Sequence, residues 1–161
     1  MTPTNIISIT PVLASLVSLL AVLPIVFFGN KPNLREGATF LAGFIKLGLV
    51  LSMLPVILAG NKIEYTLWEI VPNLSIAFRV DGLGMIFALV ASSLWIITSL
   101  YSIGYMRGLK EHSQTRFYAF FAISLSATIG VAFSANLLTL YLFYEMLSLA
   151  TFPLVTHHQD K

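Results

Sequence analysis

The chain has 161 residues and a net charge of +2, and 57% of its residues are hydrophobic while only 10% are charged. A typical soluble domain has about 25% charged residues and cannot bury so much apolar surface, so the composition excludes a soluble protein and predicts an integral membrane protein. The lack of cysteine excludes a cysteine-ligated iron–sulfur cluster or a disulfide framework within the chain, and the scattered basic residues do not predict nucleic-acid binding.

Five apolar stretches are each long enough to cross the membrane, because a bilayer core about 30 Å thick needs roughly 20 apolar residues in a helix. The first stretch has neither a basic start nor a small-residue cleavage site, so we expect a retained helix and not a signal peptide. Pro11 lies in its first turns, where proline is tolerated, and Pro24 is expected to kink its far end. We predict an all-α protein with one transmembrane domain over residues 1–161 and spans at residues 6–28, 37–59, 83–106, 117–133 and 136–156.

The connections between these spans differ in length. Between the second and third spans, two apolar-rich runs at 67–71 and 74–80 flank the turn dipeptide Pro72-Asn73, which predicts a short β-hairpin. A plain extended loop is the alternative. The connection between the fourth and fifth spans is very short, so these two helices must be antiparallel neighbours.

The basic residues in the loops predict the orientation of the chain, because cytoplasmic loops carry an excess of lysine and arginine. The connection between the second and third spans has two basic residues, Lys62 and Arg79, and they lie among acidic residues. We therefore expect the N-terminus outside, the hairpin on the periplasmic side and the C-terminus in the cytoplasm. The cytoplasmic side would then hold Lys31, Arg35, Arg107, Lys110, Arg116 and Lys161.

Two charged residues lie near the middle of predicted spans, Lys46 in the second and Glu145 in the fifth. A charged side chain at the bilayer centre costs about 2.5–3.5 kcal/mol on insertion scales, and such residues usually have a function. Lys46 has apolar neighbours in the sequence, and it could pair with Glu145, face another subunit or reach toward water. It is a candidate for proton transfer, and a packing or subunit contact is the alternative.

Glu145 is the stronger candidate, because polar and aromatic residues share its helical face. Tyr141 lies four residues before it, while Ser148 and Phe152 follow at three and seven residues. Pro153 removes a backbone donor and leaves a carbonyl free for water or a side chain. We expect Glu145 to be a carboxylate buried in the membrane that relays protons, supported by Tyr141, Ser148 and Pro153. A glutamate that only pins a helix contact is the alternative.

The remaining polar candidates are weaker. Ser124 and Thr128 share one face of the fourth span, where small hydroxyl residues most often allow close helix packing, and a water chain is the alternative. His157 and His158 could relay protons at the cytoplasmic mouth. A metal site there is not expected, because adjacent histidines point in different directions.

Three segments resemble the antiporter-like membrane subunits: YSIGYM at 101–106, RFYAFF at 116–121 and ANLLTLYLFYE at 135–145. That family includes the large proton-pumping chains of respiratory complex I, the membrane-bound hydrogenases and the Mrp sodium/proton antiporters. The segment FRVDGL at 78–83 is similar to the family's entry into its third helix, and YEMLSLATFPLV at 144–155 looks most like the D subunit of Mrp antiporters.

The resemblance implies a role for Glu145, which falls on the family's fifth-helix glutamate. In the family this glutamate pairs with a lysine on the seventh helix and gates proton movement. The resemblance also implies a periplasmic hairpin after the second helix and an external N-terminus. Family members are much longer, however, so this chain resembles only their N-terminal part. Glu145 stands without its lysine partner, and Lys46 matches no pumping lysine of the family.

These observations predict a proton-translocating, and by resemblance sodium-exchanging, subunit of a multi-subunit antiporter or redox-driven pump in the prokaryotic inner membrane. The partners would be other membrane subunits. No cofactor and no catalytic site of its own are expected, and any NADH- or ferredoxin-linked oxidoreductase chemistry would belong to other chains. A non-conducting scaffold subunit is the alternative. A secondary transporter for a small solute is disfavoured, because the chain has no pair of Gly/Pro-broken helices in repeated positions.

Overall fold

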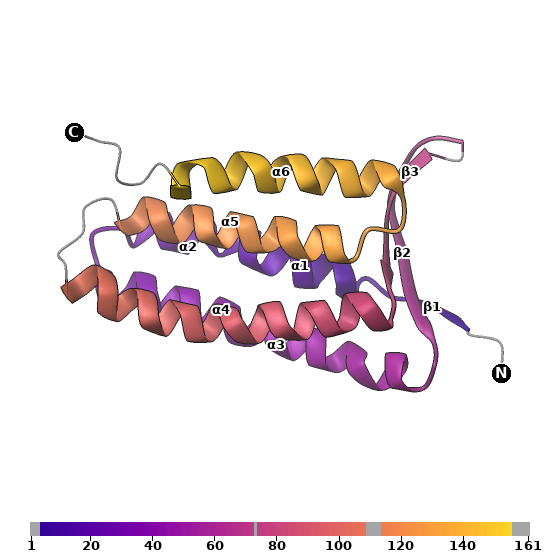
Figure 1. Ribbon diagram of the computed structural model, residues 1–161, viewed down its shortest axis with the longest axis horizontal. Coiled ribbons are helices and arrows are strands. Elements are labelled where there is room, and N and C mark those ends of the chain that lie inside the picture. The colour runs from indigo at the N-terminus through magenta and orange to yellow at the C-terminus, as the bar shows by residue number, and fades with distance from the viewer. Residues whose placement is uncertain (1–3, 73, 109–113, 156–161) are drawn as a thin grey trace.

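A computed structural model describes residues 4–72, 74–108 and 114–155, and every predicted span is helical in it (Figure 1). Within these residues, five spans are long and apolar enough to cross a membrane, as the sequence predicted. The first span consists of two short helices, and the other four are each one helix. The helices are α1 (Thr10–Leu20), α2 (Val22–Phe27), α3 (Pro32–Leu58), α4 (Gly82–Gly108), α5 (Gln114–Ala132) and α6 (Leu137–Val155).

The first span differs from its prediction at both ends. The helix begins at Thr10 and not at residue 6, because Asn5–Ile7 forms a strand, β1. The helix is interrupted at Ala21, between α1 and α2. Pro24 explains this break, since it has no N–H to donate to the Leu20 carbonyl and its ring crowds that carbonyl. The interruption is local, because Ala21 keeps helical dihedral angles and its N–H still donates to the Val17 carbonyl at 3.0 Å.

The second span starts earlier than predicted, at Pro32 and not at residue 37. Proline suits the first turn of a helix, where its missing N–H has no intrahelical partner. At 1.5 Å per residue, the 27 residues of α3 extend about 40 Å, which exceeds the hydrocarbon core of the bilayer. Arg35 and Glu36, predicted to lie in a loop, are therefore part of α3, and they are 3% and 6% exposed.

The predicted hairpin is confirmed and belongs to a three-stranded sheet. β2 (Lys62–Val71) pairs antiparallel with β3 (Leu74–Val80), and β1 pairs parallel with β2. β2 begins five residues before the predicted run. Ile63, Phe78 and Val80 are buried beneath the helix ends, which explains why a hairpin with one apolar side is stable at this position.

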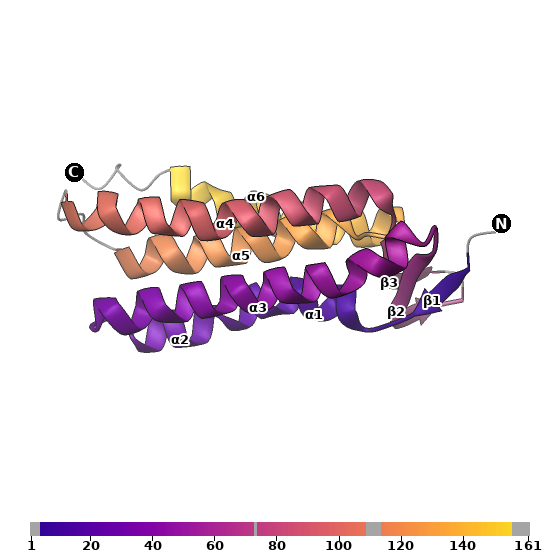
Figure 2. The same cartoon turned by 90° about the horizontal axis from the view of Figure 1, so that it is seen from below.

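The sheet covers one end of the helix bundle (Figures 1 and 2). The opposite end carries basic residues. We call that opposite end the basic end, because Lys31, Arg35 and Arg107 lie there. Within the bundle, α5 packs against α1, α2, α4 and α6, while α3 packs against α1 and α4. As predicted from the short connection, α5 and α6 are antiparallel neighbours, and the ring of Phe143 lies against Gly130.

Two apolar clusters fill the bundle at different depths. The cluster next to the sheet is lined by large aliphatic and aromatic side chains, among them Val50, Met53, Met85, Ile129 and Phe133. The cluster nearer the basic end contains smaller residues beside two aromatic rings, and comprises Ala21, Ile25, Ala42, Trp95, Tyr118, Ala119 and Ala122. Large apolar side chains therefore fill the interior near the sheet. Alanines and the rings of Trp95 and Tyr118 make up more of the interior nearer the basic end.

Candidate functional site

The helix that carries Glu145 is held at its start by hydrogen bonds to the sheet. The Asn136 side chain caps α6, since its Oδ1 accepts the Thr139 backbone N–H at 2.9 Å and its Nδ2 donates to the Ser75 carbonyl at 2.6 Å. Thr139 Oγ1 in turn accepts the Ala77 backbone N–H at 3.0 Å. The sheet therefore sets both the position and the rotation of α6.

Glu145 lies near the middle of α6, and its side chain is exposed. Tyr141 and Ser148 are exposed on the same face, as the helical spacing predicted. The opposite face packs against α5 and β3, and there Thr139 and Ala150 are buried. The described residues leave the Glu145 side chain uncovered, because α6 is an outer helix and they cover only one of its faces. Its burial in the membrane stays a prediction.

Pro153 lies inside α6, where it cannot donate a backbone hydrogen bond to the Leu149 carbonyl. Nearby, Thr151 Oγ1 donates to the Leu147 and Ser148 carbonyls at 3.0 and 3.1 Å. The last turns of α6 therefore combine a missing backbone bond with side-chain bonds to the backbone. This irregular stretch begins three residues beyond Glu145.

Lys46 lies in the middle of the bundle and is completely buried, with 0% of the residue exposed. Its Nζ donates to Ser18 Oγ at 2.7 Å and to the Leu125 carbonyl at 3.3 Å, and it lies 5.1 Å from the centre of the Trp95 ring. Among the described residues it forms no ion pair. Among the described residues Lys46 neither pairs with Glu145 nor faces outward, because α1, α4 and α5 enclose it. Its contact with water stays a prediction.

Lys46 belongs to a polar network that links α1, α3 and α5. Ser18 Oγ donates to the Ser15 carbonyl at 3.2 Å. Ser15 Oγ donates to the Ser126 carbonyl at 3.0 Å, and Ser126 Oγ donates back to the Ser15 carbonyl at 2.8 Å. Sequence reasoning missed Ser15, Ser18 and Ser126. Their signal was two serines three residues apart in an otherwise apolar span, which places both on one helical face.

Ser124 and Thr128, which the sequence predicted to share one face of α5, have a different role from Ser126. Thr128 Oγ1 donates to the Ser124 carbonyl at 2.8 Å, within the same helix. Ser124 is buried, and Thr128 is partly buried. The Thr128 bond stays within α5, whereas Ser126 makes the bonds between helices.

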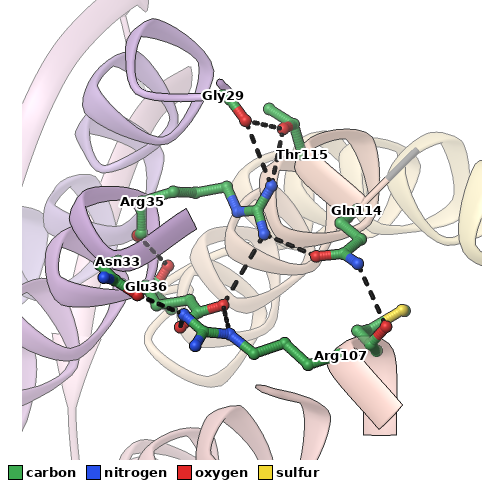
Figure 3. Close-up of polar contacts among 9 residues, drawn as sticks. Gly29, Asn33, Arg35, Glu36, Arg107, Gln114 and Thr115 are labelled. Atoms are coloured by element: carbon green, nitrogen blue, oxygen red, sulfur yellow. Dashed lines mark hydrogen bonds and ion pairs between the residues drawn. The ribbon is translucent and has the colours of Figure 1, made fainter. Parts of the chain in front are cut away.

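A second polar site, the ionic cluster of Arg35, Glu36, Arg107 and Gln114, closes the basic end (Figure 3). Arg35 Nη2 donates to Gln114 Oε1 at 2.8 Å and lies 3.8 Å from Glu36 Oε1. Arg107 donates to both Glu36 carboxylate oxygens, at 3.0 and 2.6 Å. The Arg35 guanidinium also lies 5.2 Å from the centre of the Tyr118 ring. The cluster therefore fastens α3 to α4 and α5.

The remaining predicted site residues, His157 and His158, lie outside the described residues. The structure thus places the two charged candidates in different environments. Lys46 lies in an enclosed network inside the bundle, and Glu145 lies on an outer face of α6.

Comparison with known proteins places this arrangement among respiratory and antiporter chains. Residues 70–118 match the family of the complex I (NADH-ubiquinone oxidoreductase) chain 5 N-terminus. The Na⁺/H⁺ antiporter A-type subunit of Alkalihalophilus pseudofirmus is 38% identical over 107 residues, which cover 63% of this chain and 13% of that protein. The corresponding A1-type subunit of Staphylococcus aureus is 31% identical over 113 residues, or 70% of this chain and 14% of that protein.

The chain is similar to antiporter-like membrane subunits. The fold is similar too: a chain of the archaeal membrane-bound sulfane sulfur reductase superimposes with a TM-score of 0.74 at 20% identity, covering 88% of this chain and 22% of that one. A chain of the Mrp complex from Dietzia sp. gives a TM-score of 0.62 at 17% identity, with coverage of 89% and 27%. This chain therefore spans about one seventh of the curated relatives' length. The finer resemblance to an Mrp D subunit stays a prediction.

Proposed function

We propose that this chain is part of a proton-translocating subunit of a multi-subunit membrane antiporter or redox-driven pump, with Glu145 as a mid-membrane proton relay. One observation carries the proposal: Glu145 lies halfway along an outer helix, on a face with Tyr141 and Ser148 that the described helices leave uncovered. An ionisable group at that depth is costly unless a partner or water stabilises it, and such groups usually mark ion pathways.

The face of α6 that carries Glu145 is the side on which a partner helix would complete the site. A basic residue on that helix would stabilise the Glu145 carboxylate when close and favour its protonation when withdrawn, because an opposite charge favours the charged form. The Leu149 carbonyl, which receives no backbone hydrogen bond from Pro153, is a further acceptor for water on the same helix. Glu145 would thus release its proton when the cation approaches and bind one when the cation withdraws, so that one proton moves per cycle.

The ions, partners and orientation are part of the same proposal. Sodium is proposed as the exchanged ion because relatives are named as subunits of Na⁺/H⁺ antiporters. Other membrane subunits are proposed as partners because the structural neighbours come from multi-subunit membrane complexes. The basic end would face the cytoplasm and the sheet the outside of an inner membrane, since Lys31, Arg107 and Arg116 all lie at the basic end. His157 and His158 would pass protons at that cytoplasmic mouth.

The relay is tested by Glu145→Gln, which keeps the shape of the side chain and removes its proton exchange. Proton transport is measured in everted vesicles, and assembly is measured on a native gel. We expect the variant to assemble and to lose transport by about tenfold or more, in the range typical of a lost proton-transfer group. The matched control is Glu69→Gln, the same change at an exposed position of β2. Full transport in an assembled Glu145→Gln complex would refute the relay, and loss of assembly would favour the scaffold function.

Lys46 is proposed as a second proton-transfer group inside the bundle, and Lys46→Met tests it. Methionine keeps the length of the side chain and removes the cation. Replacing a buried ionic group by an apolar one is often neutral or stabilising, so the variant should assemble with undiminished thermal stability. Transport should fall if Lys46 carries protons. Lys62→Met at the sheet is the control, and unchanged transport in Lys46→Met would leave Lys46 a packing residue.

A further inference from the structure

Several buried polar atoms near Lys46 and near the ionic cluster have no hydrogen-bond partner in the described part of the protein. On α4 these are Ser92 Oγ, Trp95 Nε1 and Ser99 Oγ. Ser92, Trp95 and Ser99 are spaced by three and four residues, so they form one stripe along the helix. All three are at most 2% exposed. At the basic end, Arg35 Nε and Tyr118 Oη are also buried without a partner.

The contacts of α3 with α4 place this stripe at a defined depth. Gly43 lies against Trp95, and Lys46 Nζ lies over the Trp95 ring. Glu36 pairs with Arg107 at the basic end. Ser99 must therefore lie between these two levels. Lys46 is ten residues from Glu36, a rise of about 15 Å, so the stripe beside Lys46 lies roughly half the thickness of a 30 Å bilayer core from the ionic cluster.

Polar groups lie on both sides of Lys46 within the bundle. Toward the sheet, Ser15 and Ser126 are buried and bonded to each other, and the large apolar side chains Val50, Met53, Met85, Ile129 and Phe133 lie beyond them. Toward the basic end, the apolar cluster of Ala42, Tyr118, Ala119 and Ala122 precedes the charged groups of the ionic cluster. The unpartnered atoms of the α4 stripe are therefore enclosed in the interior beside Lys46.

We infer that the Ser92–Trp95–Ser99 stripe and Lys46 bind a file of internal water within the helix bundle. A buried donor or acceptor without a partner is costly, and buried waters normally satisfy such groups with two to four hydrogen bonds each. Lys46 has three donors and uses two of them on Ser18 and Leu125, so the third can reach the same water. The file lies inside α1–α5, separate from the outer face that carries Glu145.

The file can be tested in the intact complex without any substitution, by X-ray radiolysis of native membranes and mass spectrometry of the oxidised peptides. Hydroxyl radicals form from the bound water itself, so labelling reports water next to a side chain. Trp95 and Met85 are a matched pair, because they lie on the same helix, are both 1% exposed, and react readily with the radical. Each rate is divided by its rate in the unfolded chain.

We expect the corrected rate for Trp95 to exceed that for Met85 by about tenfold or more, because only Trp95 adjoins bound water. Equal protection of both residues would overturn the inference. The labelling does not depend on transport. It therefore detects the water file even if the chain moves no protons, and it separates failure of this inference from failure of the proposed function.

The contribution of the stripe is tested by Ser99→Val, which replaces a hydroxyl of the stripe with an apolar side chain. Ser93→Val is the matched control, because Ser93 is exposed on the other side of α4. Ser99→Val should lower the Trp95 rate by about tenfold, and Ser93→Val should leave it unchanged. An unchanged Trp95 rate in assembled Ser99→Val would show that Ser99 does not bind the water beside Trp95, which would overturn the stripe as the binding site.

Discussion

Glu36 and Arg107 are 71 residues apart in the sequence and form a bidentate ion pair at the basic end, with Arg107 Nε and Nη2 each donating to one carboxylate oxygen. The Glu36 side chain is 8% exposed, whereas the Arg107 side chain is 46% exposed. The pair is therefore asymmetric: the carboxylate is enclosed in the bundle, and the guanidinium reaches it from the rim. Glu36 also lies 3.8 Å from Arg35 of the same helix, and Arg35 donates to Gln114 of α5, so the cluster as a whole connects α3, α4 and α5.

Arg107→Gln should destabilise the chain by about 1.5–3 kcal/mol, the usual worth of hydrogen bonds to a charged group, because it leaves the enclosed Glu36 carboxylate with weaker partners. Arg107→Lys should fall between this variant and the wild type, since it keeps the charge and loses the fork geometry. The control is Arg79→Gln, which breaks the exposed pair with Glu64 and should cost less than about 1 kcal/mol. Denaturant titration in detergent measures all three, and equal effects of Arg107→Gln and Arg79→Gln would contradict the asymmetry.

Gly130→Ala should separate α5 from α6. A Cβ atom at Gly130 would overlap the ring of Phe143, so the helices must shift, at a cost of about 1–3 kcal/mol. The double variant Gly130→Ala/Phe143→Leu should recover part of this loss, because the smaller side chain leaves room. Thermal unfolding of the solubilised protein measures both. Gly104→Ala is the control, since no neighbouring atom lies within 4 Å of a Cβ there; an equal loss at Gly104 would refute the packing explanation.

Asn136→Ala should loosen the start of α6, and with it the placement of Glu145. The substitution removes the helix cap and the bond to the Ser75 carbonyl, and caps are worth about 1–2 kcal/mol. Asn136→Asp keeps the acceptor for the Thr139 N–H and should cost less. Hydrogen exchange of the first-turn amides of α6, beside overall stability, distinguishes the two variants. The Thr139 amide is expected to exchange faster in Asn136→Ala only. Identical exchange in Asn136→Ala and Asn136→Asp would mean that the bond from Asn136 to the Ser75 carbonyl, and not the helix cap, holds the start of α6.

The fold was largely predictable from local patterns. Membrane-length apolar runs predict helices because lipid offers no hydrogen-bond partners to the backbone, and this constraint acts along the chain without reference to distant residues. The hairpin was predictable for a similar reason, because a turn dipeptide between two apolar-rich runs is a local signal. The strand β1 was not predictable, since three exposed residues beside an apolar helix carry no distinguishing pattern and pair with β2 only after the bundle has formed.

The site was predictable in residue type but not in surroundings. The sequence by itself determined that Lys46 and Glu145 lie near the middle of their helices, because that position follows from counting residues along a helix. It also determined that Tyr141, Glu145 and Ser148 share a face, because the helical period sets that angle. Which way each face points was decided only by the tertiary structure. Packing of α6 on one side of α5 leaves Glu145 outward, and closure of α1, α4 and α5 around α3 encloses Lys46 with Ser18 and Trp95, because rotation about a helix axis is set by contacts between residues far apart in the chain.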